Sequence, residues 1–463
     1  MATQREPNAA WPTIDEAARA LARGETTSRA LVEACLERAL DPAGEGARAF
    51  VRISAAEARA AADAYDALRA AGAHPGPYAG IPIAIKDLFD VAGQETRAGS
   101  RVLAGRPAAA ADAPAVAKLR AAGFVMLGRT NMTEFAYSGL GINAHYGTPL
   151  NPWQRDERRI PGGSSSGAAV AAADGMALMG LGSDTGGSCR IPAALCGIVG
   201  FKPTARRVSR EGAIPLSTSL DSVGPLANSV ACCATIDAII ADPSVRDRSN
   251  DRSAPALHGL RAALAGSYTT DGMDDAVGAA FARALSALSA AGVQLSEPSL
   301  PELHEIPRIN AKGGLVGAEA YAWHRSLIGQ LPELYDPWVL QRFDAGRSQS
   351  AADYIDVLDA RRRVHRAIHP KLRAVDVMLA PTVPIVAPRL DALTETETSN
   401  KVNLLLLRNP ALVNFLDGCA ISIPIHRRGE APAGLMLIGA PGQDRRLLAI
   451  AAQAEAALAA LRG

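Results

Sequence analysis

The chain has 463 residues, and its 48 basic and 47 acidic side chains leave a net charge of +1. This balance excludes the strong basic or acidic excess that would indicate nucleic acid or a charged surface as a partner. No window approaches 18 uninterrupted apolar residues, and the N-terminus has no apolar signal segment, so we expect neither a membrane span nor secretion. The six cysteines follow no disulfide or metal spacing, which predicts reduced, buried thiols in a cytoplasmic protein.

The N-terminal part is expected to be helical. Thr13 and Glu16 fit a capping box at the start of a first helix, which Gly24 can end. Ser28 can cap a second helix, because apolar residues follow it at helical spacing. Residues 54–72 are typical of a third helix.

The next segment alternates strands with a helix. An apolar strand over 81–85 leads directly into Lys86. A helix over 113–122, which Gly123 ends, precedes a second strand over 124–127. Helices and strands at this spacing predict an α/β sheet. Burial favours the neutral form of a lysine, so Lys86 is a candidate base.

Two Gly-rich turns follow, at 162–167 and 184–188, and they bracket a stretch of small apolar residues. That stretch predicts a central helix over 168–181, since it has no polar face. Glycine tolerates positive φ and close approach, so such turns let backbone N–H groups converge on a reacting oxygen. Ser188, which ends the second turn, is therefore a candidate nucleophile.

The second half of the chain continues the alternation of strands and helices. Strands are predicted near 197–201, 260–264, 375–379, 420–424 and 434–438. Helices are predicted near 273–291, 314–328, 350–373 and 444–461. The charged stretch 244–254 is expected to be a surface connection.

The two turns together resemble the amidase signature family. That family's hallmark is a Gly-Gly-Ser-Ser stretch, a helix of small residues, and then Asp-x-Gly-Gly-Ser-x-Arg-x-Pro. The chain carries the first part at 162–165 and the second at 184–192. The similarity continues through residues 128–135, 200–204, 380–382 and 434–436, and it is weakest over about 240–370.

The resemblance implies the fold, although the length alone would favour two or three domains. It implies a single large α/β/α unit spanning 1–463, with a mixed central β-sheet covered by helices on both faces. Its expected parts are N-terminal helices at 13–72, a catalytic core at about 80–240, a substrate-side segment at about 240–370 and the rest of the core at 371–463.

The resemblance also implies roles for individual residues. Ser188 would be the nucleophile, Ser164, held on a cis peptide, the proton relay, and Lys86 the base. The backbone N–H groups of the second turn would form an oxyanion hole: Thr185, Gly186, Gly187 and Ser188. Three further side chains would support the site: Ser165, Asp184 and Arg190. Four residues would line the acyl pocket: Met132, Phe135, Tyr137 and Ser138.

The resemblance implies an amidohydrolase that cleaves small neutral amides, and the same chemistry extends to anilides, esters and carbamates. We expect a small-molecule substrate, no cofactor or metal, no nucleic acid, no membrane, and a monomer or homodimer. The alternative is the glutaminase subunit of a tRNA-dependent amidotransferase, but residues 335–339 lack the Gly-Thr-Tyr pattern that resembles its glutamine-binding half.

Histidine chemistry is the other alternative. A Ser-His-Asp hydrolase would need a Gly-x-Ser-x-Gly elbow, which is missing at Ser188. His145 is the histidine nearest the Gly-rich turns, and we interpret it as structural or pocket-lining. His365 and His369 have a spacing that suits a metal, but arginines crowd that helix face and favour a solvated surface.

Overall fold

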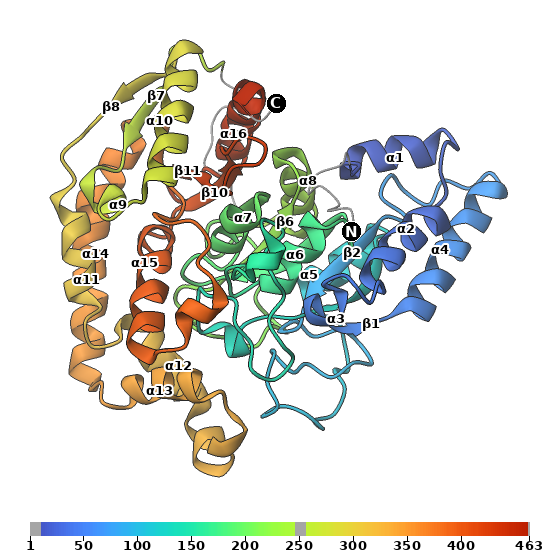
Figure 1. Ribbon diagram of the computed structural model, residues 1–463, viewed down its shortest axis with the longest axis horizontal. Coiled ribbons are helices and arrows are strands. Elements are labelled where there is room, and N and C mark those ends of the chain that lie inside the picture. Colours follow the sequence, from blue (N-terminus) through green and yellow to red (C-terminus); the bar gives the residue numbers. More distant parts are fainter. Residues whose placement is uncertain (1–10, 246–255, 462–463) are drawn as a thin grey trace.

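One mixed sheet runs through the molecule (Figure 1). The structure is a computed structural model that describes residues 11–245 and 256–461. Within these residues the sheet has eleven strands in the order β1-β3-β2-β4-β6-β5-β10-β11-β9-β7-β8. The strands are β1 Phe50–Ile53, β2 Pro82–Lys86, β3 Val125–Thr130, β4 Met179–Asp184, β5 Val199–Lys202, β6 Ser222–Ala227, β7 Arg261–Leu264, β8 Gln294–Ser296, β9 Val377–Pro381, β10 Cys419–Pro424 and β11 Gly434–Gly439.

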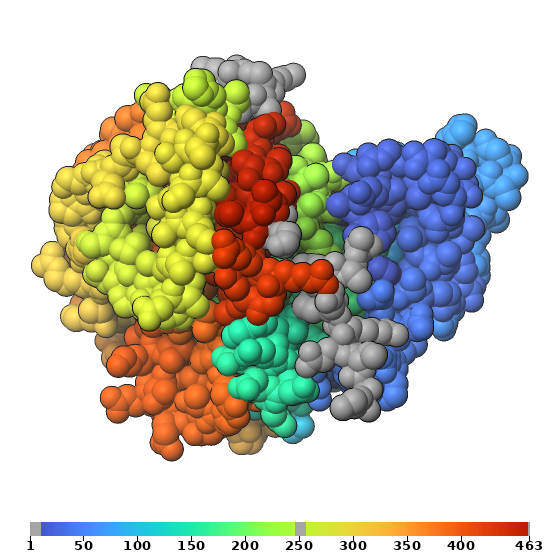
Figure 2. Space-filling view, turned by 45° about the horizontal axis from the view of Figure 1, so that its top comes forward, coloured from blue at the N-terminus to red at the C-terminus, as the bar shows by residue number. Residues whose placement is uncertain are grey.

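Helices surround the sheet, as expected for this α/β fold. They are α1 Ile14–Ala22, α2 Ser28–Ala39, α3 Gly46–Ala49, α4 Ala55–Ala70, α5 Pro114–Ala121, α6 Ser166–Ala173, α7 Arg190–Cys196, α8 Val230–Ile240, α9 Ser267–Thr270, α10 Asp275–Ala290, α11 Ile306–Ile309, α12 Gly314–Gln330, α13 Pro337–Arg347, α14 Ala351–Arg373, α15 Thr396–Phe415 and α16 Asp444–Leu458. In Figure 2 the N-terminal helices (blue) and the segment around α10 (yellow) lie at opposite ends, with α16 (red) between them.

The pairing places β2 and β4 next to each other in the interior of the sheet. β2 runs parallel to both β3 and β4, and β4 runs antiparallel to β6. Both β2 and β4 are buried along their whole length, as strands with neighbours on both sides and helices around them must be. The ends of β2 and β4 thus bring Lys86 and Asp184 to the same edge of the sheet.

Most expected elements are confirmed to within a few residues. Thr13 and Glu16 form the capping box of α1. The cap of α2 is displaced by one position, because Thr27 accepts from the Ala30 N–H at 3.0 Å, while the Ser28 hydroxyl accepts from Arg69 at 2.8 Å.

The helix expected over 168–181 is wrong in its second half. α6 ends at Ala173, Gly175 has a φ of +69°, and Met179 begins strand β4. An apolar run without polar interruptions fits a buried strand as well as a buried helix, and only the neighbouring strands decide between them. Gly180 also requires close packing, because a Cβ there would lie 2.7 Å from the Cβ of Ala168 on α6.

Several elements carried no prediction, among them β6, α7, α8, α13 and α15. The expected surface connection at 244–254 lies mostly outside the described residues. All six cysteines are free and buried, as predicted. Within the described part of the chain, no helix is both long and apolar enough to cross a membrane.

Candidate active site

Lys86 is a fully buried amine surrounded by three serine hydroxyls. It ends the apolar strand β2, and its side chain is 0% exposed. Its Nζ lies 2.8 Å from Ser164 Oγ and 2.9 Å from both Ser165 Oγ and Ser183 Oγ. An ammonium donates three hydrogen bonds, whereas a neutral amine donates two and accepts one. Since hydroxyls both donate and accept, these three serines can satisfy Lys86 in either protonation state.

Burial decides which state Lys86 prefers. Removal from water disfavours the charged form and lowers the pKa of Lys86 to about 7. The negative charges of Asp184 and Asp221 act in the opposite direction, but their effect is weaker than that of desolvation. A large fraction of Lys86 is therefore neutral, and able to accept a proton, near neutral pH.

The three serines come from two places in the chain. Ser164 and Ser165 end the first Gly-rich turn just before α6, and the Gly163–Ser164 peptide bond is cis. Ser183 comes from β4, which is parallel to β2, so it reaches Lys86 from the neighbouring strand. The sequence prediction missed Ser183, because the strand that carries it was expected to begin as a helix.

Asp184 organises the second Gly-rich turn. Its Oδ1 accepts from the Gly187 N–H at 2.8 Å, and its Oδ2 accepts from the Cys189 N–H at 3.0 Å. Arg190 donates to the same carboxylate through Nη2 at 2.8 Å and Nε at 3.0 Å. Asn414 of α15 donates to both the carbonyl and the carboxylate of Asp184.

The Asp184–Arg190 pair is completely buried, with both side chains 0% exposed. Burial alone would raise the pKa of Asp184, but the Arg190 charge and the hydrogen bonds outweigh it and lower the pKa to about 2. The guanidinium has no free edge, since it also donates to the Pro410 carbonyl and to Asn414 Oδ1. A paired and fully hydrogen-bonded ion pair of this kind holds the backbone around it in one shape.

The turn leaves three backbone donors available. Among the described residues, the N–H groups of Thr185, Gly186 and Ser188 have no backbone hydrogen-bond partner. Gly187 differs from the expectation for the oxyanion hole, because its N–H is already bound to Asp184. Gly187 serves the turn in another way: its φ is +128°, and a Cβ there would lie 2.5 Å from Pro410.

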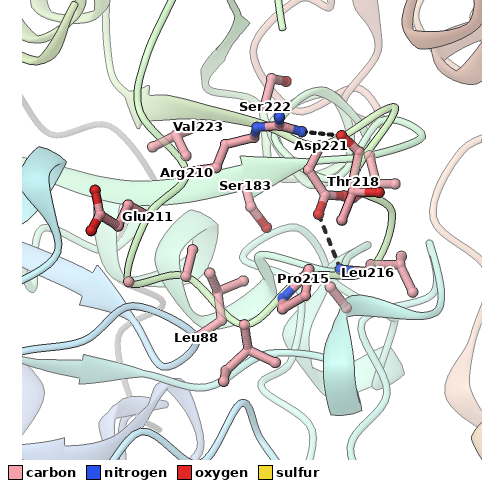
Figure 3. A pocket seen from close by; sticks show the side chains of 15 residues that line it. Leu88, Ser183, Arg210, Glu211, Pro215, Leu216, Thr218, Asp221, Ser222 and Val223 are labelled. Carbon is pink, nitrogen blue, oxygen red and sulfur yellow. Dashed lines mark hydrogen bonds between the residues drawn. The ribbon is translucent and has the colours of Figure 1, made fainter. Parts of the chain in front are cut away.

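A cavity of about 330 Å³ adjoins this turn and the lysine cluster (Figure 3). Ser183 and Thr185 contribute to it from β4 and the second Gly-rich turn, and Figure 3 shows Ser183 directed into it. Most of the remaining wall comes from the loop between β5 and β6. The lining residues of that loop are Arg210, Glu211, Gly212, Ala213, Ile214, Pro215, Leu216, Thr218 and Asp221. The cavity is therefore mainly apolar, with charged groups only on the loop.

The four residues expected to line the acyl pocket do not line this cavity. Only their neighbour Ala136 lines the cavity. Phe135 packs in a buried aromatic cluster with Trp323, His324, Tyr335 and Phe343.

Met132 is fully buried, and Tyr137 is half-buried against Phe343. The Ser138 hydroxyl donates to Asn403 Oδ1 at 2.9 Å. An apolar segment beside an active site serves the core as readily as a pocket, so the sequence pattern could not separate the two uses.

The histidines considered above have structural partners. His145 Nε2 hydrogen-bonds to Glu134 Oε1 at 2.8 Å, away from the cavity lining. His365 and His369 bind the carbonyl oxygens of Phe415 and Leu416, at 2.6 and 2.8 Å, at the end of α15. Their i, i+4 spacing therefore serves a helix terminus, where such carbonyls lack intrahelical partners.

Comparison with known proteins agrees with the fold and extends over most of the chain. The amidase family model matches residues 30–448. A 2-amino-5-chloromuconic acid deaminase of Comamonas testosteroni is 36% identical over 97% of this chain and 96% of its own. A glutamyl-tRNA(Gln) amidotransferase subunit of Roseiflexus castenholzii is 35% identical over 95% of this chain and 94% of its own.

Solved structures give the same result. A crystal structure of an amidase superposes with a TM-score of 0.86 at 34% identity, over 96% of this chain and 99% of that one. A chain from a complex described as revealing the origins of an s-triazine catabolic enzyme superposes with a TM-score of 0.85 at 33% identity, over 95% and 98%. The chain therefore belongs to the amidase family, the family that the two Gly-rich turns resemble, and is a hydrolase of amide C–N bonds.

Proposed function

We propose that the chain is a free-standing amidohydrolase of small neutral amides, acting through a Ser188 acyl-enzyme and a Ser-cisSer-Lys triad. The observation that carries this proposal is the buried Lys86 amine, 2.8 Å from the Ser164 hydroxyl, beside a turn with three unused backbone donors. A serine hydroxyl needs a base before it can attack a carbonyl carbon, and a lysine with a pKa of about 7 can be that base.

The proposed reaction begins at the Ser188 hydroxyl. Ser188 loses its proton through Ser164 to neutral Lys86 and attacks the amide carbonyl carbon. The N–H groups of Thr185, Gly186 and Ser188 donate to the oxygen as it becomes negative. The proton then returns through Ser164 to the leaving nitrogen, the C–N bond breaks, and water hydrolyses the resulting ester. Donors aimed at a developing oxyanion are each worth on the order of 3 kcal/mol of barrier.

Ser165 and Ser183 would keep Lys86 in position. Each lies 2.9 Å from the amine, and the Ser165 hydroxyl also donates to the Ser183 carbonyl at 3.3 Å. With three hydroxyl partners, Lys86 stays hydrogen-bonded whether or not it holds the transferred proton. The base can then cycle between its two states without reorganising its surroundings, which is the basis of electrostatic preorganisation.

The mainly apolar cavity supports an uncharged substrate, and the same chemistry extends to anilides, esters and carbamates. The deaminase relative acts, by its name, on an amino-substituted unsaturated acid, so a compact acidic substrate is the nearest alternative within the same mechanism.

The glutaminase alternative is less well supported, despite the amidotransferase relatives. Tyr335 is buried in the aromatic cluster, and Asp336 caps α13 through the Trp338 and Val339 N–H groups. The stretch that would have to bind glutamine is therefore used to build the fold.

The test is covalent labelling of Ser188. A fluorophosphonate probe should add one mass equivalent to the parent protein and none to Ser188→Ala, which should also have lost amide turnover. Ser54→Ala is the matched control, because the Ser54 hydroxyl is buried and unpartnered within the described residues; it should label like the parent. Labelling that persists in Ser188→Ala would overturn the proposal.

A further inference from the structure

The Asp221 carboxylate joins the loop that walls the cavity to the turn that carries Ser188. Its Oδ1 accepts from the Thr185 hydroxyl and, at 3.0 Å, from the Ser217 N–H, and its Oδ2 accepts from the Leu216 N–H at 3.0 Å. The link follows from strand pairing. Asp184, the last residue of β4, pairs with Ser222, the first residue of β6. Thr185, which follows Asp184, and Asp221, which precedes Ser222, are therefore neighbours.

This carboxylate is held in place for a structural purpose. Burial raises the pKa of Asp221 to about 6, while the hydrogen bonds from Thr185, Ser217 and Leu216 oppose that rise. Two cationic groups also face it: Arg210, which donates to the Thr218 carbonyl, and the more distant Lys86. At neutral pH, Asp221 is therefore ionised, and its acceptor positions are used by the protein itself.

The loop is held from its other side as well. Glu319 of α12 accepts from the Ser217 hydroxyl at 2.6 Å and from the Ser219 N–H at 2.9 Å. Tyr354 of α14 donates to the same carboxylate at 2.8 Å. Helices of the segment where the family resemblance is weakest thus fix the loop, and the loop in turn presents Asp221 to the catalytic turn.

Thr185 needs such an anchor, because the turn after it has little stiffness of its own. It is followed by Gly186 and Gly187, which restrict the backbone less than any other residues. Asp184 fixes the far side of the turn by binding the N–H groups of Gly187 and Cys189. Among the described residues, Asp221 is the one hydrogen-bond partner of the Thr185 side chain.

We propose that Asp221 is a positioning residue for amide hydrolysis: by binding the Thr185 hydroxyl, it aims the Thr185 N–H at the oxyanion. This inference rests on the proposed function of Ser188. A donor works only when it lies about 2.7–3.1 Å from the oxygen of the transition state. A more mobile Thr185 would therefore weaken transition-state stabilisation more than substrate binding.

The test compares isosteric variants of both partners. Thr185→Val removes the hydroxyl and keeps the shape, whereas Thr185→Ser keeps the hydroxyl. We expect Thr185→Val and Asp221→Asn to lower kcat and the rate of fluorophosphonate labelling by about 10- to 100-fold, somewhat below the loss of a whole oxyanion donor. KM should change little. Thr185→Ser should recover most of the kcat that Thr185→Val loses, and the double variant should be no slower than the worse single variant.

Asp444→Asn is the control, because Asp444 is also a buried carboxylate that accepts from a threonine hydroxyl and from backbone, at Thr204. It should reduce thermal stability without slowing the labelling of folded protein. Labelling and kcat at the parental level in Thr185→Val, a loss confined to KM, or additive losses would each overturn the inference. If Asp221→Asn fails to fold, the comparison of Thr185→Val with Thr185→Ser decides by itself. Failure of the proposed function shows separately, as labelling of Ser188→Ala.

Discussion

Lys86 combines a proposed catalytic role with a cost in folding stability. Its strand is apolar, and the only polar partners of its amine among the described residues are the three serine hydroxyls, from Ser164, Ser165 and Ser183. No carboxylate in the described part of the chain forms an ion pair with it. With its pKa lowered to about 7, this buried amine loses its proton far more readily than an exposed lysine, and keeping it in the core costs folding free energy.

The first prediction concerns the pH dependence of Lys86. Because the pKa of Lys86 is lowered to about 7, kcat should fall as pH drops through about 7 and remain level into mildly alkaline solution. Lys86→Met should lower kcat by at least ~10²-fold, and Lys86→Arg should restore little, since a guanidinium stays protonated. Near-parental kcat in Lys86→Arg would rule out the lysine as base.

A histidine base would give a similar acid limb, so folding stability provides the independent readout. The unfolded-state pKa of lysine is about 10.4, so between pH 7 and 10.4 the unfolded chain holds a proton that the folded chain has released. The free energy of unfolding of the parent protein is therefore lowered most at low pH and increases as pH rises. Its free energy of unfolding, relative to Lys86→Met, should increase by about 1.4 kcal/mol per pH unit, measured by urea unfolding at pH 8 and 9. A difference that does not change with pH would show that Lys86 is charged in the folded state.

At the scale of elements, α15 supports the nucleophile turn from outside. Asn414 accepts from Arg190 Nη2 at 2.7 Å and donates to Asp184, and Pro410 contacts the turn at Gly187. The same C-terminal end of α15 is held by α14, whose Arg361, like the two histidines described above, binds its last carbonyl groups.

The second prediction tests this support with two asparagines of the same helix. Asn414→Ala removes partners from the buried Asp184–Arg190 pair, and we expect a loss of about 1–3 kcal/mol in unfolding free energy together with a lower kcat. Asn409→Ala is the control, because its amide binds the Thr269 and Pro381 carbonyls and not the turn. It should lose similar stability with kcat unchanged; equal effects on kcat would show that α15 has no specific role in the site.

At the scale of the whole molecule, one sheet connects the proposed catalytic residues with the later half of the chain. β5 pairs with β10, and the sheet continues through β11 and β9 to β7 and β8. Residues 261–296 thus share a sheet with the catalytic strands, while α12 reaches the cavity loop through Glu319.

The third prediction follows from this arrangement. The purified chain should hydrolyse small neutral amides alone, without glutamine, ATP, tRNA or added partner chains, because the described site contains its own base, nucleophile turn and cavity. A panel of aryl amides, aliphatic amides, carbamates and glutamine measures this, with Ser188→Ala as the blank for every substrate. Activity confined to glutamine, and only with partner chains added, would establish the glutaminase alternative instead.

The sequence by itself determined the family, the α/β class and the local chemistry of the two Gly-rich turns. These depend on residues close together in the chain: the spacing from Asp184 to Arg190 already contains the buried ion pair, and the apolar strand before Lys86 already implies its burial. Local patterns of this kind can be recognised without knowledge of the fold.

Only the tertiary structure decided which distant residues complete the site. Ser183, Asp221 and Asn414 reach the Lys86 cluster or the catalytic turn from β4, from the residue before β6 and from α15, and no local sequence pattern singled out any of the three. It also decided that Phe135 belongs to the core and that the loop at 210–221 walls the cavity. Strand order sets these contacts, over separations of up to 230 residues in the chain, and hydrophobic periodicity carries no information about which strands become neighbours.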